Sequence, residues 1–162
     1  MRRATRLGAA AALALMGCLA AGAAARGGPA AACHVAVTPI RFGAYNPLSP
    51  FPDRADGYLV YNCSAPVRIT IALGLGHGGS PDPRLMVGGR STRGSALDYG
   101  LYLDPAGTLL WGDGSGGTQP YRALVARPNV NVAVPIFARL PGHQLGAPVG
   151  AYADSLLVTI TY

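Results

Sequence analysis

The sequence predicts an all-β protein folded as an antiparallel β-sandwich. Its 23 glycines and 14 prolines interrupt the chain at intervals of roughly ten residues, which is the spacing of short strands joined by turns. Apolar and polar residues alternate between these breaks, and no stretch after residue 25 keeps a helical period. Short alternating strands at this spacing are typical of two packed antiparallel sheets. We find no internal repeat and no domain boundary in this region.

The first 25 residues are predicted to be an export signal. Three arginines (Arg2, Arg3 and Arg6) precede an apolar run over residues 7–21, and alanines at 23–25 give an A-x-A cleavage pattern. Alanines at 30–32 offer a second cleavage site. The predicted organisation is therefore a signal (1–25), a short N-terminal segment (26–32) and one β-sandwich domain (33–162). No later segment reaches the ~20 apolar residues that a membrane span requires.

Three cysteines divide between the signal and the domain. Cys33 and Cys63 lie in two strand-like runs of an exported chain, so the simplest prediction is a disulfide that joins the two strands. Cys18 lies in the apolar run of the signal and leaves with it. The alternative is that Leu15-Met16-Gly17-Cys18 is a lipobox, which would make Cys18 a lipidated N-terminus.

The alternating runs place the strands. In the run 67–73, Val67, Ile69 and Ile71 alternate with polar or small residues, so one face is predicted to be core. The last run is regular and carries no charge after Asp154, which predicts an exposed edge open to strand addition; the alternative is a central strand paired on both sides. The predicted strands cover residues 35–40, 57–61, 67–73, 84–87, 99–103, 109–112, 130–136 and 155–162.

Charge and motifs argue against an enzyme or a nucleic-acid-binding protein. Once the signal is removed, ten scattered arginines face seven aspartates, and the chain has neither lysine nor glutamate. Residues 74–79 fit G-x-G-x-x-G, but two prolines (Pro81 and Pro83) follow where a nucleotide site needs a helix, so we predict a turn. His34, His77 and His143 stand alone at spacings that suit no metal site. We predict no catalytic residue, cofactor, metal or small-molecule substrate.

Ordered blocks through residues 33–162 resemble the spore coat protein U domain family. They begin at Cys33 with Arg-Phe-Gly-Ala-Tyr-Asn-Pro-Leu-Ser-Pro at 41–50 and Asn-Cys at 62–63. Tyr-Gly-Leu-Tyr-Leu-Asp at 99–104, Trp-Gly-Asp-Gly at 111–114 and Gly-His-Gln at 142–144 follow. The last blocks are Gly-Ala-Tyr-Ala-Asp-Ser at 150–155 and Val-Thr-Ile-Thr-Tyr at 158–162.

The resemblance extends to subunits of archaic chaperone–usher pili of the Csu type. It implies an immunoglobulin-like sandwich that lacks its final strand and is completed by donor-strand complementation. The partners that it implies are a periplasmic pilus chaperone, an outer-membrane usher and other pilin subunits. It further implies export through the periplasm to a surface fimbrium and a role in adhesion and biofilm formation.

The site residues predicted on this basis are structural. Cys33 and Cys63 form the disulfide. Apolar residues at the edges of the first and last strands are expected to bind a neighbouring subunit; these are Val35, Val37, Ile40, Leu156, Val158, Ile160 and Tyr162.

The segment before Cys33 departs from the pattern of pilus-shaft subunits, which carry an apolar donor strand there. Residues 26–32 span about 25 Å when fully extended, and Pro29 lacks a ladder donor. We therefore expect a subunit that accepts a strand at a tip or terminal position. Two alternatives remain: a self-sufficient secreted or lipid-anchored coat or matrix protein, and a carbohydrate- or surface-binding module that uses the loop 48–52.

Overall fold

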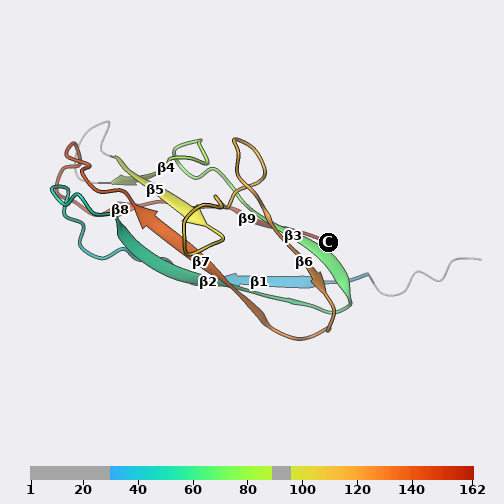
Figure 1. Cartoon of the computed structure of the whole chain (residues 1–162). Helices are drawn as coiled ribbons and strands as arrows, with labels where there is room; N and C mark the ends of the chain where they lie inside the picture. The colour runs from blue at the N-terminus through green and yellow to red at the C-terminus, as the bar shows by residue number, and fades with distance from the viewer. Residues whose placement is uncertain (1–29, 89–95) are drawn as a thin grey trace, which may run out of the picture.

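The computed structural model describes residues 30–88 and 96–162 (Figure 1). Residues 1–29 lie outside the described ranges. They contain the predicted signal with Cys18, the first predicted cleavage site and positions 26–29 of the short N-terminal segment. Nine strands run through the described ranges. They are β1 (Cys33–Val37), β2 (Asp53–Cys63), β3 (Val67–Leu73), β4 (Arg84–Gly88), β5 (Ala96–Tyr102), β6 (Tyr121–Val125), β7 (Val132–Leu140), β8 (Tyr152–Ala153) and β9 (Val158–Thr161).

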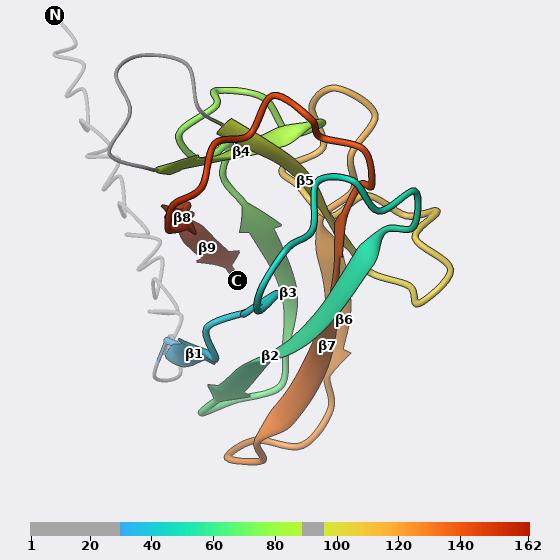
Figure 2. The same cartoon turned by 90° about the vertical axis from the view of Figure 1, so that its left-hand side faces the viewer.

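The strands form two antiparallel sheets that lie face to face, as Figures 1 and 2 show. One sheet has six strands in the order β1-β2-β7-β5-β4-β8, and the other has three in the order β6-β3-β9. The longest ladder joins β2 to β7, from Asp53 opposite Leu140 to Tyr61 opposite Val132. The predicted all-β antiparallel sandwich is confirmed.

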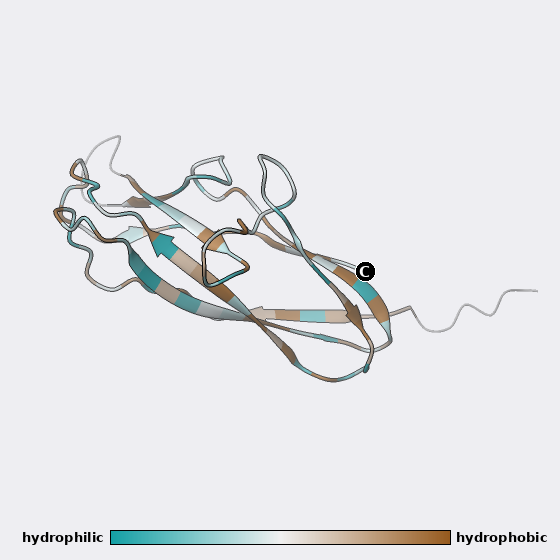
Figure 3. Ribbon diagram, in the orientation of Figure 1, coloured by the Kyte–Doolittle hydropathy of each residue, from teal (hydrophilic) through white to brown (hydrophobic). Residues whose placement is uncertain are grey.

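The core fills the space between the sheets with alternate residues of each strand. In β3, Ile69, Ile71 and Leu73 are buried, and Arg68 on the opposite face is exposed. Figure 3 shows this alternation of apolar and polar residues along β3. The period-2 pattern that predicted the strand therefore also identifies its buried face.

Trp111 is the largest fully buried side chain. Its indole Nε1 donates a hydrogen bond to the Ile71 carbonyl oxygen at 3.1 Å, and its ring lies 6.0 Å from the ring of Tyr121. The strand predicted over 109–112 is wrong: only two isolated bridges form there, Tyr102 with Leu110 and Trp111 with Gln119. A glycine-rich turn with left-handed residues at 114, 116 and 117 follows and leads to Gln119, whose N–H donates to the Leu110 carbonyl oxygen at 2.8 Å.

Other strand boundaries differ from the prediction for local reasons. β1 ends at Val37 and not at residue 40, since Pro39 has no N–H for a ladder. β7 begins at Val132, after Asn129 adopts a left-handed φ of 58°, and it continues to Leu140. β6 and β8 were not predicted, because a five-residue run and a two-residue bridge carry too little alternation to be recognised.

The predicted disulfide between Cys33 and Cys63 is confirmed. The two cysteines are directly opposite each other in the β1–β2 ladder, and Cys63 is fully buried. The bond ties β1 to β2 at the end of the ladder where β1 enters the sheet.

β1 and β9 are the outermost strands on one side of the sandwich. Within residues 30–88 and 96–162, β1 pairs only with β2 and β9 pairs only with β3. Figure 2 shows both strands on the same side of the molecule. The predicted exposed edge at the last strand is therefore confirmed, and a second unpaired edge faces it from the other sheet.

Replacing both cysteines (Cys33→Ala with Cys63→Ala) is expected to lower the free energy of unfolding by about 3–4 kcal/mol. The bond joins residues 30 positions apart, so its loss releases the loop entropy of the unfolded chain. Urea unfolding of the oxidised and double-alanine proteins measures the difference. Reduced wild-type protein should show the same loss, whereas a change under about 1 kcal/mol would contradict this role.

Candidate functional site

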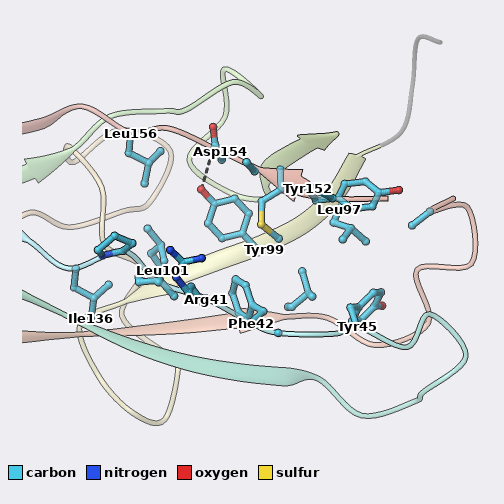
Figure 4. Close-up of a pocket in the computed structure, with 18 of the residues that line it drawn as sticks. Arg41, Phe42, Tyr45, Leu97, Tyr99, Leu101, Ile136, Tyr152, Asp154 and Leu156 are labelled. Carbon is cyan, nitrogen blue, oxygen red and sulfur yellow. Dashed lines mark hydrogen bonds between the residues drawn. The ribbon is translucent and has the colours of Figure 1, made fainter. Parts of the chain in front are cut away.

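An apolar groove runs between the two unpaired edges and has a volume of about 1180 Å³. Its walls come from β1, from the β1–β2 connection and from the segment that leads into β9. Its floor is made of core side chains of both sheets, shown in Figure 4. The floor residues are Leu73, Met86, Leu97, Tyr99, Leu101, Ile136 and Leu140.

The β1 wall is held from one side only. Val35 and Val37 line the groove, and the disulfide and the β2 ladder fix the strand. Just beyond β1, the Thr38 N–H donates to the Tyr58 carbonyl oxygen at 2.9 Å, and the Tyr58 N–H donates back to Thr38 Oγ1 at 2.8 Å. This reciprocal pair ends the strand without leaving its last polar groups unsatisfied.

The β1–β2 connection forms one end of the groove. The Phe42 ring packs edge-on against Tyr99, with centroids 6.4 Å apart. The Tyr45 hydroxyl donates to the Pro141 carbonyl oxygen at 2.8 Å and accepts from the Gln144 N–H at 3.1 Å. The motif blocks at 41–50 and 142–144 thus meet in space, and their polar contacts hold the loop that carries Phe42.

Asp154 anchors the segment that leads into β9. Its Oδ2 accepts a hydrogen bond from the Tyr99 hydroxyl at 2.7 Å. Its Oδ1 accepts from the His77 N–H at 2.9 Å and the Ser155 N–H at 2.8 Å, and it lies 2.9 Å from His77 Nδ1. The Asp154 side chain is 3% exposed and that of His77 is 55% exposed. One carboxylate therefore joins three elements: the six-stranded sheet, the β3–β4 loop and the β9 wall.

The electrostatics of this cluster follow from its hydrogen bonds. Burial by itself would raise the pKa of Asp154, but the donors from Tyr99, His77 and Ser155 outweigh it and hold that pKa below its ordinary value of 3.8. Burial, with the bond to the Asp154 carboxylate, raises the pKa of Tyr99. Asp154 is therefore a carboxylate and Tyr99 a neutral donor at neutral pH.

The β3–β4 loop is shaped to meet Asp154. Gly76 has a left-handed φ of 71°, and a Cβ there would collide with the Asp154 carboxylate. Behind the loop, Arg84 is fully buried and donates to the carbonyl oxygens of Gly74 and of Trp111, the latter at 2.9 Å. Burial lowers the pKa of Arg84, against the attraction of Tyr99 and Asp154. The glycine-rich run at 74–79 is a turn, as predicted.

The structure brings five of the seven predicted subunit-binding residues into the groove lining. These are Val35, Val37, Ile40, Leu156 and Val158. Ile160 packs against the core from the same face of β9 but lies outside the lining, and Tyr162 is 52% exposed. No sequence pattern predicted that Asp154 would contact Tyr99 and His77, since these residues lie far apart in the chain, although Tyr99 and Asp154 each fall in one of the ordered blocks.

The described ranges carry no group of three or more His, Cys, Asp or Glu side chains that could hold a metal ion. Nor do the described residues contain a helix long and apolar enough to cross a membrane. The described part of the groove presents apolar side chains and two strand edges.

Comparison with known families identifies the domain. The Spore Coat Protein U domain matches residues 22–159. The chain belongs to the Spore Coat Protein U domain family. The match covers every strand except the last two residues of β9, so the resemblance predicted from the ordered blocks is confirmed. A search of curated proteins finds no match.

A solved structure with a similar fold is a chain in the CsuC–CsuE chaperone–tip adhesion subunit pre-assembly complex. It comes from the archaic chaperone–usher Csu pili of Acinetobacter baumannii. The TM-score is 0.57 at 18% identity, and the match covers 82% of this chain and 40% of that chain. The Spore Coat Protein U chain thus shares the fold and spans less than half the length of its structural neighbour.

Tyr99→Phe is expected to raise the pKa of Asp154 and to lower the free energy of unfolding at pH 7 by about 1–3 kcal/mol, because a hydrogen bond to a buried charge is lost. The pKa of Asp154 is lower in the folded protein than its ordinary value of 3.8. The ionised side chain therefore contributes its full stabilisation to the fold above pH 3.8, and this stabilisation is lost as the pH falls through the pKa of the folded state. The difference between wild type and variant should therefore shrink below pH 3.8. Urea unfolding across this pH range measures it.

Tyr58→Phe is the matched control, because Tyr58 is 51% exposed and its hydroxyl makes no hydrogen bond within the described residues. It should leave both stability and its pH dependence unchanged. Equal behaviour of the two variants would show that Asp154 does not depend on Tyr99.

Proposed function

We propose that this protein is an exported, non-catalytic structural subunit of a chaperone–usher pilus or similar surface fibre. Its sandwich accepts a β-strand from another protein between β1 and β9. The observation that carries the proposal is the apolar groove between two unpaired strand edges. Membership of the Spore Coat Protein U domain family and the fold shared with a Csu pilus complex support it.

An extended strand can pair with the two strand edges and can also cover the apolar floor between them. Its backbone supplies hydrogen bonds to the free edges of β1 and β9, and its alternate side chains enter between the sheets. The walls offer apolar contacts at Val35 and Val158, while Ala36 and Thr159 face outward. The proposed partners, in order of assembly, are a periplasmic chaperone, an outer-membrane usher and a neighbouring pilin subunit.

The segment before Cys33 bears on the position in a fibre. We propose a tip or terminal position, with a role in adhesion and biofilm formation, because the seven residues 26–32 include Pro29 and are too few to pair along the groove as a donor strand. N-terminal sequencing of the exported protein tests this step. A mature N-terminus well upstream of Arg26 would supply more donor residues and contradict it.

Supplying a strand in cis tests the proposed function. The full chain is exported alone, and in parallel with a flexible linker and a strand of alternating valine and threonine appended after Tyr162. The appended strand should convert an aggregating or weakly stable chain into a soluble monomer, with a thermal midpoint higher by roughly 10 °C or more. A free chain that is already a stable monomer, and gains nothing, would instead favour a self-sufficient secreted or lipid-anchored coat protein.

Substitutions on the two faces of β9 locate the accepted strand. Val158→Asp puts a charge into the groove and should abolish the gain from the appended strand, because an unpaired buried carboxylate is strongly disfavoured. Thr159→Asp, on the outward face, should keep most of the gain. Thermal unfolding of each variant with and without the strand is the measurement, and equal losses in both would contradict the assignment.

A further inference from the structure

Arg41 is a cation in the wall of a largely apolar groove. It follows β1, lines the groove and is exposed. Figure 4 shows its side chain pointing into the pocket that Tyr99 and Leu101 also line. Within residues 30–88 and 96–162, no carboxylate lies within 4.0 Å of it and no hydrogen bond to its guanidinium is formed.

Two other arginines have protein partners for their guanidinium groups. Arg84 donates to the carbonyl oxygens of Gly74 and Trp111. Arg139 donates to carbonyl oxygens at 105 and 106, and its guanidinium lies 5.5 Å from the centre of the Tyr102 ring. Among the described residues Arg41 has neither kind of partner, and in the open groove water can satisfy its guanidinium.

The described lining of the groove offers Arg41 no carboxylate that is not already engaged. Asp154 is the one acidic residue among the described lining residues, and its two oxygens receive hydrogen bonds from Tyr99, Ser155 and His77. The remaining titratable groups of the lining are tyrosines at 45, 99 and 152. The hydroxyls of these three donate to the Pro141 carbonyl, to Asp154 and to the Pro148 carbonyl.

A strand that fills the groove removes water from Arg41. A charge buried without a partner costs several kcal/mol, whereas a carboxylate opposite an arginine forms short, charge-assisted and often bidentate hydrogen bonds. The incoming strand therefore fits best when one of its side chains is acidic at the position opposite Arg41.

We propose that the strand accepted by this groove comes from a neighbouring subunit and carries an aspartate or glutamate that pairs with Arg41. This inference rests on the proposed function and names the chemistry of its partner: an extended segment with alternating apolar residues and one carboxylate. A neighbouring subunit stays in the assembled fibre, where the ion pair would offset the lasting cost of burying Arg41 and set the register of the strand. A chaperone must leave, so it gains less from such a pair.

The test uses the full chain with a linker and an appended strand of alternating valine and threonine. Each inward-facing valine in turn is replaced by aspartate and, as a matched neutral control, by asparagine. At one position the aspartate strand should unfold at a temperature roughly 3 °C or more above its asparagine partner. Arg41→Gln should remove that advantage, and Arg41→Glu should reverse it. Arg122→Gln, on the outward face of β6, should leave it intact.

Three results would overturn the inference, and they differ in what else they reject. If the aspartate and asparagine strands stabilise the sandwich equally at every position, the Arg41 side chain points into solvent in the filled groove. Only the proposed ion pair is then wrong. If no appended strand stabilises the chain, the proposed function fails as well. If charge matters only for capture by the periplasmic chaperone, seen as loss of co-purification with Arg41→Glu, the occupant is the chaperone and not a subunit.

Discussion

The central constraint on this protein is that two sheets close a hydrophobic core along one side but leave its other side open. Among the described residues β1 ends the six-stranded sheet and β9 ends the three-stranded sheet, and each has one edge of backbone donors and acceptors that pairs with no described strand. Between them, core side chains such as Leu73 and Ile136 form the floor of a groove. Free strand edges and uncovered apolar surface both favour association with a further strand. This geometry supports the proposed role in a fibre.

Within the described part of the chain, each strand that walls the groove lacks a neighbour on one side and is held in place by contacts on its other side. These contacts are of two kinds. The Cys33–Cys63 bond and the β2 ladder hold β1, so this wall keeps its place without a neighbour on its free side. Asp154 holds the opposite wall through Tyr99 in the other sheet and His77 in the β3–β4 loop. Covalent and charge-assisted contacts are both strong enough to fix a strand that lacks one ladder.

Local patterns predicted most of the fold but only part of the site. Alternation identified β3 and the inward face of β9, and two cysteines in an exported chain were enough to predict the disulfide. Trp111 was misassigned to a strand, because the apolar run Leu109, Leu110 and Trp111 has the composition of a strand whether or not it pairs along its length. The Asp154 cluster and the orientation of Arg41 depend on contacts between residues more than 40 positions apart or on the path of a loop, and no local pattern encodes either.

Amide hydrogen exchange along β1 and β9 is the most direct measurement of the central claim. The account predicts that β9 amides not bonded to β3, and β1 amides not bonded to β2, exchange rapidly in the chain alone. The same amides should slow by roughly 100-fold or more when a strand occupies the groove, while β6, the other edge of the smaller sheet, stays unchanged. Full protection of β1 and β9 in the chain alone would contradict the account, because the sandwich would then be complete without a partner.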